Sequence, residues 1–183
     1  MSQTNAEPAD LDVSQWLSLA KAMPSWLTSG GSVSDALEIS PDKLEAMYQL
    51  GHGFYAQGRY EDAFKVFSML VIFAHRNDRY LMALAGSAQM TGRYKDALQH
   101  YSTATLILVD DPRPIYFSAE CLIAIGNYDL AAESLRLVIE LTEDSSAHQV
   151  LGSRAEVLLS SISNQGNEPE TGLSLTTESN DSQ

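Results

Sequence analysis

The sequence predicts an all-α fold, in which helix–turn–helix units repeat along the chain and stack as a solenoid. The strongest observation is a block that recurs every 34 residues and reads GRYEDAFKVF, GRYKDALQHY and GNYDLAAESL. Three kinds of residue recur at this spacing, namely Gly58, Gly92 and Gly126; Tyr60, Tyr94 and Tyr128; and Ala63, Ala97 and Ala131. A unit of this kind buries its apolar face only against its neighbours, which favours a continuous stack.

The period and the pattern are typical of tetratricopeptide repeats, each made of two helices. Counting each glycine as position 15 predicts three repeats, at 44–77, 78–111 and 112–145. The first helices are expected at about 42–56, 79–90 and 113–125, and the second helices at about 61–74, 95–108 and 129–141. The glycines permit a tight turn between the two helices. The alanines are small because the helices cross closely there.

The first repeat has a clear start signal. Ser40 suits the N-cap position, Pro41 suits the first helical position, and Asp42 places negative charge in the first turn. Residues of this kind in this order predict that the first helix begins near residue 41.

Segments on either side of the repeats complete the expected domain. Apolar residues at helical spacing predict a C-terminal capping helix at about 146–163, which would cover the apolar edge of the last repeat. The tetratricopeptide domain is therefore expected to span 11–163. Residues 1–10 are polar and expected to be disordered. Residues 164–183 carry four carboxylates and no lysine or arginine, so we expect a disordered acidic tail.

Composition argues against several classes of partner. The 183 residues carry a formal net charge of −13, which disfavours nucleic acid and anionic membrane surfaces because both are polyanions. A single cysteine, Cys121, excludes an intramolecular disulfide and fits a reducing compartment. The N-terminus lacks the basic run and apolar stretch of a signal peptide, and no run of ~18 apolar residues is present to span a membrane.

Catalysis has little support in the sequence. The four histidines, His52, His75, His100 and His148, are scattered and form no metal-ligand pair. Neither a phosphate-binding loop nor a nucleophile elbow is present. We therefore expect no enzymatic activity, no metal and no cofactor.

A peptide-binding groove is the site that the repeats predict. In tetratricopeptide stacks the first helix of each repeat lines the concave face through its positions 2, 5, 9 and 12. These positions hold Glu45, Tyr48, His52 and Tyr55 in the first repeat, Arg79, Met82, Gly86 and Gln89 in the second, and Arg113, Tyr116, Glu120 and Ile123 in the third. Apolar pockets with polar groups between them suit an extended peptide.

Two points about this set stay open at the sequence level. The aromatic residues could instead pack only between helices, and Arg79 and Arg113 could link helices through salt bridges. Gly86 would leave space at the centre of the groove, although a glycine inside a helix costs ~1 kcal/mol relative to alanine. Such a cost is easier to understand if a ligand approaches closely there.

The segment before the repeats and two short motifs inside them indicate a particular family of tetratricopeptide proteins. Residues 26–50 read WLTSGGSVSDALEISPDKLEAMYQL, GRYEDA follows at 58–63, and AECL stands at 119–122. In these features the chain resembles the class II chaperones of type III secretion systems, which hold translocator proteins, over roughly residues 12–163. It departs from them in having Thr28 and Ser29 before the glycines, His52 where an aromatic residue is common, and a longer acidic tail.

The resemblance implies a function and a cellular location. It implies a chaperone of the bacterial cytoplasm that binds an extended segment of a hydrophobic, pore-forming translocator in its groove. The client would stay soluble and competent for export. The alternative is a generic tetratricopeptide scaffold that joins the subunits of another complex, which would have no reason to carry the segment 26–50.

An N-terminal helix is expected within 11–27, ending or kinking near Met23 because Pro24 interrupts the helical pattern. It carries Trp16 and Leu17 beside Ala20. A large aromatic residue outside the repeats can fold back on the solenoid or meet a second chain. The resemblance implies a homodimer through these three residues.

Overall fold

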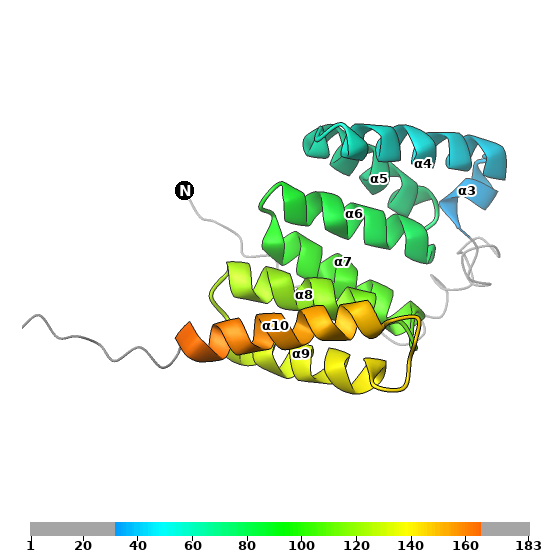
Figure 1. Cartoon of the computed structure of the whole chain (residues 1–183). Coiled ribbons are helices and arrows are strands. Elements are labelled where there is room, and N and C mark those ends of the chain that lie inside the picture. Colours follow the sequence, from blue (N-terminus) through cyan, green and yellow to red (C-terminus); the bar gives the residue numbers. More distant parts are fainter. Residues whose placement is uncertain (1–31, 166–183) are drawn as a thin grey trace, which may run out of the picture. The chain divides into compact units, whose positions relative to one another are not determined.

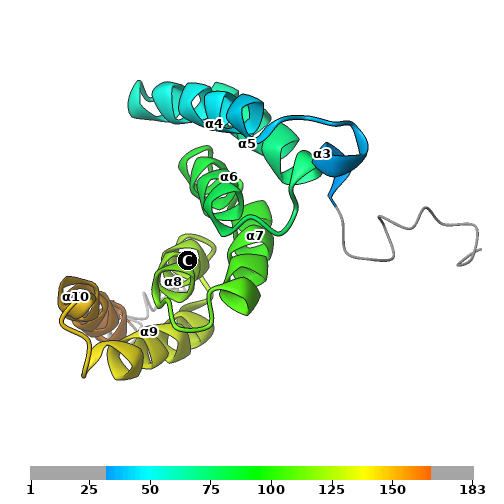
Figure 2. The same ribbon diagram turned by 90° about the vertical axis from the view of Figure 1, so that its right-hand side faces the viewer.

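The computed structural model describes residues 32–165, and residues 1–31 and 166–183 lie outside the described part (Figures 1 and 2). The expected disordered N-terminus and the expected N-terminal helix, with Trp16, Leu17 and Ala20, therefore lie outside the described residues. So does the acidic tail from residue 166 onward.

Within residues 32–165 the chain forms eight helices and no strand, which confirms the all-α tetratricopeptide fold. The six helices of the three repeats begin and end within one residue of their expected bounds. The helices are α3 (Val33–Ala36), α4 (Pro41–Ala56), α5 (Tyr60–Phe73), α6 (Asp78–Met90), α7 (Tyr94–Ile107), α8 (Arg113–Ala124), α9 (Tyr128–Thr142) and α10 (Gln149–Gln165).

Glycine turns join the two helices of each repeat. Gly58, Gly92 and Gly126 have φ of 75°, 76° and 80°, a left-handed conformation that side chains disfavour. The amide of Arg59 donates to the carbonyl of Phe54 at 2.9 Å, and the other two turns repeat this bond. This pattern is the Schellman motif, which satisfies the last carbonyls of a helix and reverses the chain.

Small side chains let the paired helices approach each other. Ala63, Ala97 and Ala131 have no exposed surface. Each lies on the second helix of its repeat, where the sequence predicted a close crossing. The two helices of a repeat lie side by side as a hairpin, as α4 and α5 show in Figures 1 and 2.

The helices form two compact units, α3–α7 and α8–α10. In the first unit, α4 packs on α5, α5 on α6 and α6 on α7, and α4 also contacts α6. Its core contains Leu44, Ala63, Phe67, Leu70, Tyr80 and Leu84. In the second unit, α9 packs on both α8 and α10. The core of this unit contains Tyr116, Ala119, Ala131, Leu135, Val138, Ala155 and Ile162.

The expected start of the first repeat is confirmed, and the capping helix begins slightly later than expected. Ser40 is the N-cap of α4, but its side chain makes no capping bond, and its backbone carbonyl accepts the amide of Lys43 at 3.0 Å instead. The capping helix α10 begins at Gln149 rather than 146, because turns through Ser145 and His148 use up the preceding residues. It also runs two residues into the expected tail and ends at Gln165, just before Gly166.

Candidate peptide-binding surface

Arg79 connects the first helices of the first two repeats. Its Nη1 lies 3.2 Å from Oε2 of Glu45, and its guanidinium lies 4.3 Å from the centre of the Tyr48 ring. Gln49 donates to the Glu45 carboxylate at 2.7 Å. This bond and Arg79 lower the pKa of Glu45 below its ordinary value. Arg79 therefore forms a salt bridge that links α6 to α4.

Tyr48 is both a packing residue and a surface residue. Its ring centre lies 5.7 Å from that of Phe67 on α5 and 5.7 Å from that of Tyr80 on α6. The ring of His52, an exposed residue one turn later, lies 6.3 Å away. Tyr48 itself stays half-buried, so part of its surface is open to a ligand while the rest belongs to the core of the unit.

A second group of residues meets around Gly86. A Cβ built on Gly86 would lie 3.8 Å from the hydroxyl of Tyr55 and 3.7 Å from that of Tyr101. Tyr101 donates to Oε1 of Gln89 at 2.8 Å. The ring of Tyr55 meets that of Tyr60 edge-on at 5.1 Å. Gly86 therefore lies beneath two tyrosine hydroxyls, and a methyl group would fit there without a clash.

Tyr101 was missed by sequence reasoning, which placed only first helices on the surface. It lies on α7, is 2% exposed, and reaches Gln89 only through its hydroxyl group. A signal was available, because the equivalent residues 34 positions away are Phe67 and Leu135. A hydroxyl at a position that is otherwise apolar indicates a polar partner on the neighbouring helix.

We call the candidate residues on α4 and α6, which all lie in the first unit, the α4–α6 surface. Half-buried Met82 belongs to it as well, on α6 between Arg79 and Gly86. The surface comprises Glu45, Tyr48, His52, Tyr55, Arg79, Met82, Gly86 and Gln89.

The four candidate residues on α8, in the second unit, differ from one another. Arg113 is paired with Asp111, and its Nε donates a hydrogen bond to Oδ1 of Asp111 at 2.9 Å. Tyr116 is only 5% exposed and belongs to the core of the unit, with Ile123 packed against that core. Burial and the nearby carboxylate of Glu120 raise the pKa of Tyr116 to about 12. Tyr116 is thus more deeply packed than a groove residue was expected to be.

Tyr116 nevertheless lines a cavity of about 450 Å³, which we name the α8–α10 pocket. Its other lining residues come from α10, and two valines among them are largely exposed: Val150 at 69% and Val157 at 66%. Sequence reasoning gave α10 only a capping role. The spacing of seven between the two valines places them on one face, apart from the core residue Ala155. The pocket is lined by Tyr116, Val150, Ser153, Arg154, Val157 and Leu158.

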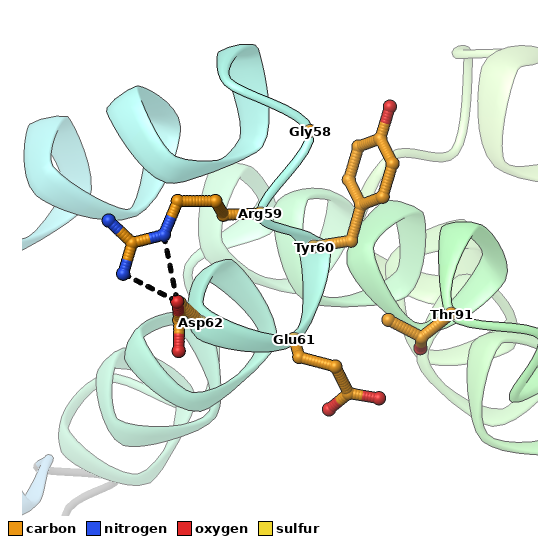
Figure 3. Close-up of a pocket in the computed structure, with 6 residues that line it drawn as sticks. All are labelled: Gly58, Arg59, Tyr60, Glu61, Asp62 and Thr91. Atoms are coloured by element: carbon orange, nitrogen blue, oxygen red, sulfur yellow. Dashed lines mark hydrogen bonds and ion pairs between the residues drawn. The ribbon is translucent and has the colours of Figure 1, made fainter.

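A smaller pocket, of about 300 Å³, lies at the turn between α4 and α5 (Figure 3). Arg59 and Asp62 point toward each other and form an ion pair of 2.6 Å, whereas Tyr60 points away from them. Glu61 pairs with Arg93 at 2.9 Å. The charged side chains that line this pocket are thus already paired, Arg59 with Asp62 and Glu61 with Arg93 of the next turn, and none of the expected groove residues lines it.

Nothing in the described part favours chemistry at Cys121. The thiol is buried, and burial raises its pKa to about 12, so the reactive thiolate is strongly disfavoured. Across residues 32–165, no group of three or more histidine, cysteine, aspartate and glutamate side chains is placed to hold a metal ion. In the same range, no helix combines the length and the apolar character needed to cross a membrane.

The fold and the repeat define a tetratricopeptide-repeat protein, and residues 80–107 match the model of the tetratricopeptide repeat family. Low calcium response locus protein H of Yersinia pestis is 36% identical over 141 residues, which cover 77% of this chain and 84% of that protein.

Two solved structures are similar to the chain over about the same length. PcrH in complex with the chaperone binding region of PopD is 32% identical, with a TM-score of 0.67, and the match covers 70% of this chain and 97% of that chain. SycD of Yersinia enterocolitica in complex with a peptide of the translocator YopD is 33% identical, with a TM-score of 0.66, covering 70% and 98%. Another structure of SycD is an alternative dimer. The chain belongs to the family of type III secretion translocator chaperones.

Proposed function

We propose that this protein is a non-enzymatic chaperone of the bacterial cytoplasm, which binds an extended segment of a hydrophobic type III secretion translocator. Its likeness to PcrH in complex with the chaperone binding region of PopD carries the proposal, because that relative is similar over 97% of its chain. Binding would shield the apolar segment and keep the translocator soluble and competent for export.

The α4–α6 surface supports a role in holding such a segment. The open side of Tyr48 offers an aromatic platform for an apolar side chain of the client, and Arg79 on that ring supplies a cation for a client carboxylate or carbonyl. Gly86 allows the client backbone to approach closely between Tyr55 and Gln89. Stacked contacts of this kind accept an extended chain without needing one rigid ligand shape.

In the second unit, we propose that the candidate residues on α8 hold a further part of the client. Ile123 and the lining of the α8–α10 pocket offer apolar contacts, and Arg113 and Glu120 offer charged ones. Trp16, Leu17 and Ala20 remain our proposed dimer contacts, by analogy with the dimeric SycD.

Co-expression tests the proposal most directly. A tagged chain would be produced together with candidate type III secretion translocators, and the proteins that co-purify would be identified by mass spectrometry. We expect the chain to form a stoichiometric complex with a translocator. We also expect an extended peptide from that translocator to bind the chain in a calorimetric titration. Recovery of the subunits of an unrelated complex, with no translocator, would favour the scaffold alternative.

A further inference from the structure

The α8–α10 pocket carries an apolar surface that no described residue covers. Val150 and Val157 leave two thirds of their surface open, and Tyr116 on α8 lines the same pocket. The two valines lie one above the other on α10, so their exposed surfaces share one face of the helix. The cavity of about 450 Å³ has room for one or two aliphatic side chains.

A cation lies at this pocket. Arg154 is an exposed lining residue, placed between the two valines on α10. The ion pairs found among the described residues do not include it; their cations are Arg59, Lys65, Arg79, Arg93 and Arg113. An apolar pocket beside a cation fits a segment that combines aliphatic and acidic side chains.

We propose that the chain's own C-terminal segment, residues 166–183, binds in the α8–α10 pocket. This segment contains two large aliphatic residues, Leu173 and Leu175. Its four acidic residues, Glu168, Glu170, Glu178 and Asp181, flank them on both sides, and it contains no lysine or arginine. The chain has only 11 lysines and arginines against 24 acidic residues, so few cations are present to attract the acids of this segment. Arg154 is one of them, and it lines the apolar pocket in which we place the leucines.

The length of the segment allows this contact. It leaves α10 at Gln165, the last residue of the helix that forms one wall of the pocket. Val157 stands eight positions earlier, ~12 Å away at 1.5 Å per helical residue. Leu173 stands eight positions later and can reach ~26 Å when extended. The segment can therefore turn back along α10 and place its leucines against the valines.

The contact is expected to be weak and exchangeable. Two leucine side chains bury little surface, and ordering several residues opposes the contact through lost conformational entropy. The tether compensates in part, because a short flexible linker keeps the segment at a millimolar effective concentration. If the pocket also holds client, as the proposed function has it, the tail acts as a built-in competitor that a longer, better-contacting client displaces.

Methyl NMR spectroscopy tests the docking without any client. The methyl resonances of Val150 and Val157 would be compared between the full chain and a chain cut after Gln165. We expect both valines to shift on truncation, while Leu84 in the first unit does not. Unchanged valine resonances would overturn the proposal. Shifts that depend on protein concentration would assign the pocket to a second copy of the chain and would also overturn it.

Matched variants of the full chain identify the contacting residues. The double variant L173S/L175S should reproduce the spectrum of the truncated chain. The control T176S/T177S changes two neighbouring residues and should keep the full-chain spectrum. If L173S/L175S also keeps it, the leucines do not occupy the pocket and the proposal fails.

Calorimetry with a translocator peptide tests the competition separately. The truncated chain should bind the peptide several-fold tighter than the full chain, and L173S/L175S should match the truncated chain. Equal affinities alongside shifted valines would overturn competition but leave docking in place. No binding by either chain would count against the proposed function, while the NMR result on docking would still stand.

Discussion

At the scale of single residues, Tyr48 of the α4–α6 surface, which we propose to bind the client, also packs within the first unit. Tyr48 contacts the core through Phe67 and Tyr80 while Arg79 covers part of its ring. Replacing Tyr48 would therefore disturb stability and binding together. Gly86 differs, because it contributes no side chain to the fold and has room for a Cβ. It is the position where binding can be tested apart from folding.

Gly86→Gln should weaken the binding of a translocator peptide by about tenfold, which corresponds to ~1.4 kcal/mol. The new side chain would extend across the surface between Tyr55 and Gln89. The melting temperature should stay the same or rise, since glutamine favours helix more than glycine does. Calorimetry and a thermal melt measure the two effects. Ser102→Gln, at an exposed position on α7, is the control and should leave the affinity unchanged. Equal affinity of both variants would remove Gly86 from the site.

Cys121 should not react with a thiol reagent at pH 8 while the protein is folded. Burial raises its pKa to about 12, so almost no thiolate exists at that pH, and the sulfur is inaccessible. Because the pKa of Cys121 is raised in the folded protein, the stabilisation by its neutral thiol is complete below pH 9.0, the ordinary pKa of cysteine. This stabilisation is lost as the pH rises toward 12. Labelling with a chromogenic disulfide should follow unfolding in urea. Rapid labelling of the native protein would contradict the buried position.

At the scale of elements, the glycines of α4 have opposite roles although they are two residues apart. A Cβ on Gly51 would lie 2.7 Å from Cε1 of the buried Phe67, so α4 and α5 approach each other there as closely as a missing side chain allows. A Cβ on Gly53 would meet nothing within 4 Å. The first glycine is required by the packing of the two helices, and the second is not.

Gly51→Ala should therefore lower the free energy of unfolding by ~1–3 kcal/mol, because the methyl overpacks the contact with Phe67. Gly53→Ala is its matched partner and should raise the same quantity by up to ~1 kcal/mol through helix propensity alone. Urea unfolding followed by circular dichroism measures both variants. Two stabilised variants would mean that α4 and α5 do not cross closely at Gly51.

At the scale of the whole molecule, each of the two units has a core made by its own helices. Burial in the described chain is complete at Phe67 and Leu70 in the first unit and at Leu135 and Val138 in the second. The tail follows the last core residue, Ile162, and contains only two large aliphatic residues beyond α10. Most of the folding free energy must therefore come from the helices and not from the tail.

Cutting the chain after Gln165 should change the free energy of unfolding by less than ~0.5 kcal/mol, the usual range for changes at a surface. A weak, exchangeable contact of the tail with the α8–α10 pocket is compatible with this small effect. Urea unfolding of the full and truncated chains decides the matter. A loss of several kcal/mol would show that the tail is part of a core, and some added aggregation alone would reflect only the loss of its charge.

The sequence by itself determined the six helices of the three repeats, their bounds to within one residue, and the glycine turns between the two helices of each repeat. These features depend on neighbours in the chain: Gly58, Gly92 and Gly126 end helices because only they adopt the left-handed conformation easily. The alanines at the crossings are equally readable, since the 34-residue period repeats each packing position. The candidate surface could also be placed on the first helices from the repeat alone, as a prediction.

Only the tertiary structure decided how the candidate residues are engaged. Arg79 pairs with Glu45, which is 34 positions away, and Tyr101 reaches Gln89 from another helix. Tyr116 turns out to be buried, and the α8–α10 pocket joins two helices that the sequence had given separate roles. The physical reason is that the 34-residue repeat predicts which face of a helix packs. Contacts between individual side chains depend in addition on how closely, and at what angle, two helices meet.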